Sequence, residues 1–170
     1  MKINIHSSVF AKLVITSFSV VIIYSNPVAA AGEIEFKATI KAECNINISP
    51  IVDLGEIPVT EFSNKSAGQE VSGYDKSFNI GTQCTGTNKY KLTMMPAKAG
   101  SGCLESGSEE IGFCLYDSAG SKINLAVGGT SLERSATVTS ETIKVIPARA
   151  SKAPTVGEHS ASMTIEIAPL

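Results

Sequence analysis

The chain has 170 residues, of which 14 are basic and 16 acidic, so its formal net charge at pH 7 is −2. Neither sign of charge is clustered, which argues against nucleic acid or an anionic membrane as a partner, because both attract clustered lysine and arginine. Past the N-terminal leader, no apolar run is long enough to span a bilayer.

The first 30 residues are typical of a secretory signal. Two lysines are followed by an apolar core from Leu13 to Tyr24, and Pro27 precedes the small residues VAAA. We expect cleavage before Ala31 or Gly32; the alternative is an uncleaved anchor, although a spanning helix needs about 20 apolar residues. Removal of residues 1–30 takes away two lysines and no acid, which leaves one domain with a formal charge of −4.

The segment 33–42 alternates between polar and apolar residues, which predicts a strand. Its apolar face consists of Ile34, Phe36, Ala38 and Ile40. Its polar face consists of Glu33, Glu35, Lys37, Thr39 and Lys41. The pattern is compatible with a strand that pairs within its own domain and with one that pairs with a neighbouring molecule.

Further short β-type runs follow along the chain, separated by Gly, Ser, Asn and Pro. They are predicted at residues 45–48, 51–59, 76–84, 90–95, 110–117, 122–127, 136–150 and 161–168. The polar stretches 60–75, 96–110 and 151–160 are predicted loops. No segment has the pattern of a long amphipathic helix, so the sequence predicts an all-β sandwich or barrel.

All four cysteines follow the leader, at Cys44, Cys84, Cys103 and Cys114. An even number of cysteines in an exported protein indicates disulfides, and four cysteines allow three pairings. There is no Cys-x-x-Cys pair, and His159 is the one histidine after the leader, so a zinc site is not expected.

The sequence offers no set of residues for catalysis or cofactor binding. His159 stands beside Glu158 on a polar loop, where a solvated pair is the expected arrangement. Glu109 and Glu110 are adjacent, so on a strand they would point to opposite sides. We predict a protein that is not an enzyme, needs no cofactor and acts by binding.

Several motifs in fixed order resemble the subunits of bacterial type 1-like pili that are assembled by the chaperone–usher route. Cys44 lies in the first strand, and the second cysteine follows it 40 residues later in FNIGTQC. The other motifs are VDLGEI (52–57), IGFCLYDSAGSKI (111–123), VIPARA (145–150), and Gly157 before the alternating Ala161, Met163, Ile165 and Ile167. The likeness extends over nearly the whole chain after the leader.

The resemblance implies an incomplete immunoglobulin-like sandwich that lacks its last strand and is completed by donor-strand complementation. Residues 31–41 would be the N-terminal donor-strand extension and residues 42–170 the pilin domain. Ile34, Phe36, Ala38 and Ile40 would fill a neighbour's groove, while Met163, Ile165 and Ile167 would line this chain's own groove and contact a periplasmic chaperone. The other implied partners are neighbouring pilus subunits and an outer-membrane usher, with export through the periplasm to a fimbrium on the cell surface.

The resemblance also guides the disulfide pairing. The family spacing implies Cys44–Cys84, and we add Cys103–Cys114, which would join the polar loop 96–110 to the following strand. The chain departs from the family in these two extra cysteines, in Pro169 at a place that is commonly aromatic, and in Ala38 where relatives usually have glycine.

The resulting function hypothesis is a structural subunit of a bacterial fimbria, either a major or a minor (adaptor) pilin, that polymerises by donor-strand exchange and supports cell adhesion. The alternative is a self-contained secreted β-sandwich that recognises a carbohydrate or a protein through its loops.

Overall fold

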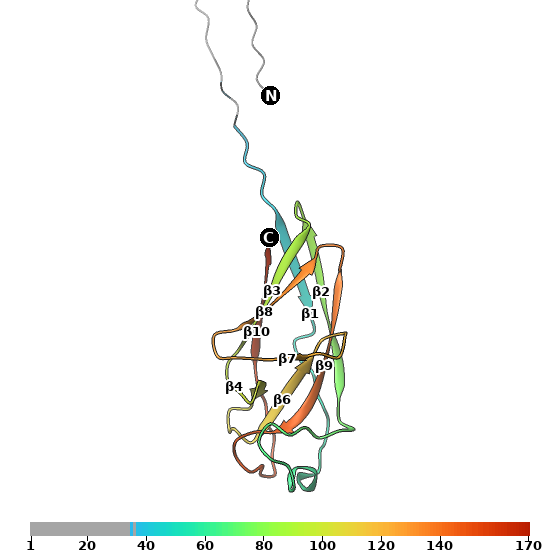
Figure 1. Ribbon diagram of the computed structural model, residues 1–170, viewed down its shortest axis with the longest axis vertical. Helices are drawn as coiled ribbons and strands as arrows, with labels where there is room; N and C mark the ends of the chain where they lie inside the picture. Colours follow the sequence, from blue (N-terminus) through green and yellow to red (C-terminus); the bar gives the residue numbers. More distant parts are fainter. Residues whose placement is uncertain (1–34, 36) are drawn as a thin grey trace, which may run out of the picture. The chain divides into compact units, whose positions relative to one another are not determined.

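The computed structural model describes Glu35 and residues 37–170 (Figure 1). The chain divides into two units, Met1–Ala38 and Thr39–Leu170. In the first unit the described residues are all exposed, and the Lys37 Nζ atom lies 3.2 Å from Oε2 of Glu35.

The described part of the second unit contains ten strands and one 3₁₀ helix. They are β1 (Glu43–Ile48), η1 (Val59–Phe62), β2 (Lys76–Thr85), β3 (Lys89–Pro96), β4 (Ala99–Gly100), β5 (Cys103–Glu105), β6 (Ile111–Tyr116), β7 (Lys122–Ile123), β8 (Thr130–Ser135), β9 (Ser140–Arg149) and β10 (Met163–Pro169). None of the described residues belongs to a helix long and apolar enough to cross a bilayer.

The strands form two antiparallel sheets. The larger sheet has the order β1-β2-β9-β6-β5-β4, with β7 also paired to β6, and the smaller one has the order β10-β3-β8. Strands β1 and β10 are therefore edge strands of different sheets, and they lie in contact with each other. The fold is all-β and of the immunoglobulin-like sandwich type.

One apolar core holds the two sheets together. The larger sheet contributes Ile80, Leu115 and Ile143, and the smaller sheet contributes Leu92 and Met94. In β2, β3 and most of β9 the buried side chains occupy every second position, as expected for a strand with one face on the core and the other in water. Leu115 lies in β6, where neighbouring residues on both faces are buried. A smaller cluster around Phe62, Val71 and Ile111 packs beneath the loop that follows η1.

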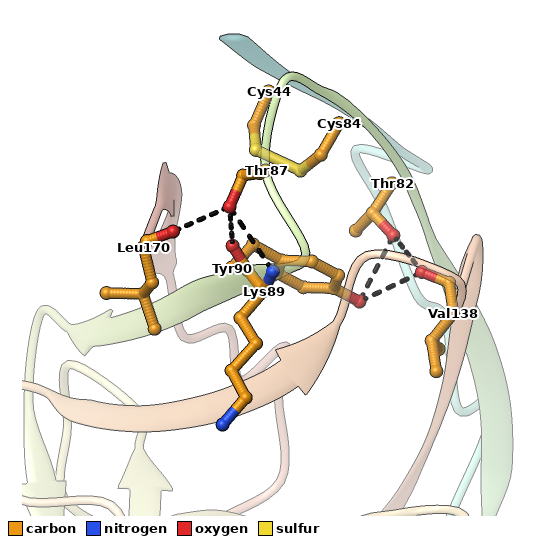
Figure 2. Close-up of a disulfide and its surroundings, with 8 residues drawn as sticks. All are labelled: Cys44, Thr82, Cys84, Thr87, Lys89, Tyr90, Val138 and Leu170. Atoms are coloured by element: carbon orange, nitrogen blue, oxygen red, sulfur yellow. Dashed lines mark hydrogen bonds between the residues drawn. A yellow bond between two sulfur atoms is a disulfide. The ribbon is translucent and has the colours of Figure 1, made fainter. Parts of the chain in front are cut away.

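Two polar contacts join the sheets where β8 turns into β9. Arg134 of β8 donates two hydrogen bonds to the buried carboxylate of Glu141 on β9, at 3.0 and 2.9 Å. Nearby, Thr82 Oγ1 lies 3.1 Å from the Tyr90 hydroxyl, and both hydroxyls lie within hydrogen-bond distance of the Val138 carbonyl oxygen (Figure 2). Every buried side-chain N or O atom among the described residues has a hydrogen-bond partner.

The structure corrects the predicted strand at 51–59. None of these residues is assigned to a strand, and η1 begins at Val59. Gly55 has φ 77°, a left-handed conformation that interrupts an extended run, and Pro50 precedes the segment while Pro58 lies within it. Leu54 nevertheless packs against the main core and Ile57 against the smaller cluster, so the apolar residues are placed inward without a ladder.

Other boundaries also differ from the sequence prediction. Strand β8 was missed because TSLERS contains a single aliphatic residue, Leu132. The predicted strand 136–150 starts only at Ser140, because the preceding residues form the turn from β8. The predicted loop 96–110 contains the short strands β4 and β5. The predicted strand 33–42 falls partly outside the described residues, and residues 37–42 are not in a strand.

Candidate functional site

The candidate site is the open edge of β10, the last strand. On one side β10 pairs with β3, so that Met163, Ile165 and Ile167 stand opposite Pro96, Met94 and Leu92. On its other side, no described residue forms a ladder with β10. The backbone groups of this edge are thus available for another strand.

The side chains of β10 are less covered than those of its neighbour. Leu92 and Met94 of β3 are each 0% exposed. Ile165 and Ile167 pack against the same core yet remain half-buried. The two strands belong to one sheet and face one core. The inward side chains of β10 are more exposed because β10 has a neighbouring strand on one side, whereas β3 has one on each side.

Strand β1 shows the same deficit on the opposing sheet. It pairs with β2 alone, and its inward residue Ile46 is half-buried while Ile48 is 37% exposed. Because β1 and β10 are in contact, the two incompletely covered strips adjoin. We call this strip, Ile46 and Ile48 with Met163, Ile165 and Ile167, the open edge.

The sequence analysis named the three β10 residues as candidate groove residues and did not name the two from β1. The missed signal was the alternation of ECNINI, in which Cys44, Ile46 and Ile48 share one face. Shallow depressions lined mainly by polar residues, among them Asn47, Ser49 and Asn79, lie where the chain leaves β1. These depressions lack the apolar lining of a ligand pocket.

Hydrogen bonds fix the C-terminal end of β10. The Leu170 amide donates to the Lys89 carbonyl at 3.0 Å, and the Thr87 hydroxyl lies 2.6 Å from the Leu170 carbonyl oxygen (Figure 2). The disulfide Cys44–Cys84, which joins β1 to β2, lies at this same end of the domain (Figure 2). The edge strands β1 and β10 are thus both anchored there.

Loop 151–160, which precedes β10, is tied to the turn between β5 and β6. The Glu109 carboxylate contacts Lys98 and lies 3.0 Å from Lys152 Nζ, and these two lysines lower the pKa of Glu109 to about 2. The Glu110 carboxylate accepts hydrogen bonds from the amide and hydroxyl of Thr155, which lower the pKa of Glu110. Both carboxylates therefore hold the loop while they are charged.

The second disulfide fixes the hairpin that carries this turn. Cys103 of β5 and Cys114 of β6 are bonded and almost fully buried. The structure thus contains both disulfides that the sequence analysis predicted, and all the described cysteines are paired.

His159, which the sequence analysis expected to be solvated beside Glu158, instead contacts Ser108 and its own loop. Its Nδ1 atom lies 3.2 Å from the Ser108 hydroxyl, and its Nε2 atom lies 2.9 Å from the Thr155 carbonyl oxygen. The carboxylate near its ring belongs to Glu110, at 3.6 Å, where the sequence analysis had considered Glu158. Among the described residues, no group of His, Cys, Asp and Glu is arranged to hold a metal ion.

The structure describes half of the predicted donor face. Ile34 and Phe36 lie outside the described residues. Ala38 is exposed, and Ile40 is 95% exposed. An isoleucine with this much contact with water lacks the burial that stabilises apolar side chains in the rest of the domain.

The family model described as Fimbrial protein matches residues 31–168. The chain belongs to the fimbrial protein family. It is therefore a pilus subunit of a surface fimbria, and the match covers all of β1 and residues 163–168 of β10.

Two other comparisons add little to this assignment. The comparison with curated proteins found no match. Among solved structures, the CupB6 tip adhesin from Pseudomonas aeruginosa is similar at 11% identity and a TM-score of 0.41, covering 74% of this chain and 43% of that one. The fimbrial protein thus spans less than half the length of that adhesin.

Proposed function

We propose that this fimbrial protein is a structural subunit that joins its neighbours by donor-strand exchange and supports cell adhesion. The open edge carries the proposal: the inward side chains of β10 are half-buried where those of β3 are fully buried. An added strand would cover Ile165 and Ile167 and pair with the free backbone groups of β10.

The N-terminal extension of another subunit supplies such a strand. Burial of Ile34, Phe36 and Ile40 would contribute roughly 1.5 to 3 kcal/mol each. Each ladder hydrogen bond would add a net contribution of about 0.5 to 1.5 kcal/mol. The entropy of ordering the extension opposes these terms.

The same open edge would make assembly depend on helper proteins. An edge strand with unsatisfied backbone groups and apolar side chains promotes aggregation. We therefore propose a periplasmic chaperone that covers Met163, Ile165 and Ile167 before assembly, and an outer-membrane usher that delivers subunits to the surface. Passage through the oxidising periplasm also fits the two disulfides.

The proposal is tested by supplying the missing strand within one chain. Residues 31–170 are extended after Leu170 by a short Gly/Ser linker and a donor strand, either residues 33–42 or the corresponding strand of a partner subunit. The linker replaces an encounter by an effective concentration on the order of millimolar, so modest affinity suffices. We expect the extended protein to be a monomer with a cooperative thermal transition, and unmodified residues 31–170 to aggregate.

The opposite result supports the alternative function. If unmodified residues 31–170 melt cooperatively as a monomer and an added strand leaves the melting temperature unchanged, the sandwich is complete by itself. The chain would then be a self-contained binding module.

A further inference from the structure

Strand β10 carries a single charged side chain. Glu166 is the one ionisable residue of β10, it is exposed, and it points away from the core. Its neighbour on β3 is the uncharged Thr93. No described residue forms a salt bridge with Glu166.

The polar face of the N-terminal extension changes sign along its length. Glu33 and Glu35 come first, and Lys37 and Lys41 follow on either side of Thr39. Residues directly opposite each other in an antiparallel pair share one face of the sheet, so each register of the extension on β10 sets a different residue beside Glu166.

Registers that keep the apolar face inward differ by steps of two residues. Every strand pair of this domain is antiparallel, so the registers below place the extension antiparallel to β10. With Lys37 opposite Glu166, the apolar pairs are Phe36 with Ile167, Ala38 with Ile165 and Ile40 with Met163. All three inward side chains of β10 are then covered, and the smallest donor residue meets the middle position.

The neighbouring registers are poorer. With Glu35 opposite Glu166, two carboxylates oppose each other, which destabilises a strand pair. With Lys41 there, Ala38 stands opposite Pro169 and Phe36 passes beyond Leu170, so a large aromatic side chain loses its contact. With Thr39 there, Phe36 meets Pro169 and no charge pair forms.

We propose that residues 33–41 of a second copy of this chain pair with β10 in the register that places Lys37 opposite Glu166, and that this intersubunit ion pair selects the register. The inference rests on the proposed function and adds the partner and the alignment of its strand. An exposed opposed pair shifts the equilibrium by roughly two- to fivefold, and like charges shift it by a similar factor in the other direction.

Paired cysteines test the register directly. Opposed residues in an antiparallel pair have Cα atoms about 4.5 to 5.5 Å apart, within the range that a disulfide spans. Fimbriae from a subunit with Lys37→Cys and Glu166→Cys should therefore run as a ladder of covalent multimers in SDS without reductant, and as monomers with reductant. The matched control, Glu35→Cys with Glu166→Cys, is displaced by two residues and should give few multimers.

Charge reversal is the second measurement, and it tests the register even if the cysteine variants do not assemble. Lys37→Glu and Glu166→Lys should each lower the urea midpoint at which fimbriae dissociate, and the double variant should restore it. Lys41→Glu combined with Glu166→Lys should restore nothing, because Lys41 would stand opposite Ser162, before β10 begins.

Two results would overturn the inference. The first is that Glu35→Cys with Glu166→Cys gives as many covalent multimers as Lys37→Cys with Glu166→Cys. The second is that normal fimbriae form, the Lys37→Cys pair gives no covalent multimers, and charge reversal leaves the urea midpoint unchanged, as expected if the extension of a different subunit pairs with β10. Both leave the proposed function standing as long as Phe36→Arg still abolishes assembly. Normal fimbriae from Phe36→Arg would instead refute the proposed function itself.

Discussion

Ile165→Asp separates folding of the subunit from assembly. In the free subunit Ile165 is half-buried, so the introduced carboxylate keeps contact with water, and the domain loses about half of the roughly 1.5 to 3 kcal/mol that burial of an isoleucine contributes. A donor strand would cover the same position and desolvate a charge without a partner, which costs several kcal/mol. We therefore expect assembly to weaken by at least about 3 kcal/mol, or roughly a hundredfold.

The assay compares surface fimbriae with periplasmic subunit in the same cells. The amount of surface fimbriae should fall far more than the amount of periplasmic subunit. Assembly should recover partly at lower pH, because burial under a donor strand raises the pKa of the introduced carboxyl and the buried group then binds a proton. The control is Thr164→Asp, one residue away on the exposed face. Equal fimbriation by the two variants would show that Ile165 does not face an incoming strand.

Four further predictions follow from other contacts. Phe36→Arg should block attachment to a neighbouring subunit, whereas Glu35→Arg on the polar face should be tolerated; equal defects in fimbria counts would rule out alternation as the determinant. Arg134→Ala should lower the urea stability of the strand-complemented subunit by at least about 2 kcal/mol, because Glu141 stays buried without its partner; Arg134→Met with Glu141→Leu should recover part of the loss, and an unchanged midpoint for the single variant would contradict this reasoning. Since Lys98 and Lys152 depress the pKa of Glu109 from 4.5 to about 2, its stabilisation is present above pH 4.5 and is lost as pH falls toward 2; the difference in melting temperature between wild type and Glu109→Gln should shrink over that range, and a constant difference would argue against the charge as its cause. Mass spectrometry of exported protein should find a start at Ala31 or Gly32 and a mass four hydrogens below the reduced form, and a free thiol at Cys44 or Cys84 would contradict the pairing.

The sequence predicted best where local pattern and tertiary role agree. The alternation of Met163, Ile165 and Ile167 is sufficient to place β10, because a strand with one buried face has a period of two. The sequence prediction was wrong at 51–59, where apolar residues suggested a strand. A strand also needs a partner for its backbone groups, and the described chain offers none there.

Strand β8 was missed for the opposite reason. Its inward positions are Thr130, Leu132 and Arg134, of which only Leu132 is apolar, so the strand has no apolar pattern. The charge is tolerated because Glu141 of β9 accepts two hydrogen bonds from it, and such a pairing depends on how β8 and β9 are brought together. The β1 share of the open edge was missed likewise, since the contact between β1 and β10 is a property of the folded sandwich.

The position of the Cys44–Cys84 bond has a mechanical consequence for a fibre. Cys44 is the second residue of β1, so under the proposed donor-strand exchange, tension along the N-terminal extension would reach a covalent link to β2 after Glu43. Hydrogen bonds from Asn45 to Ile48 are shielded from that load, and β1 cannot be peeled from its sheet one residue at a time. Under pulling, the load would then fall on the non-covalent junction between subunits and not on the ladder between β1 and β2.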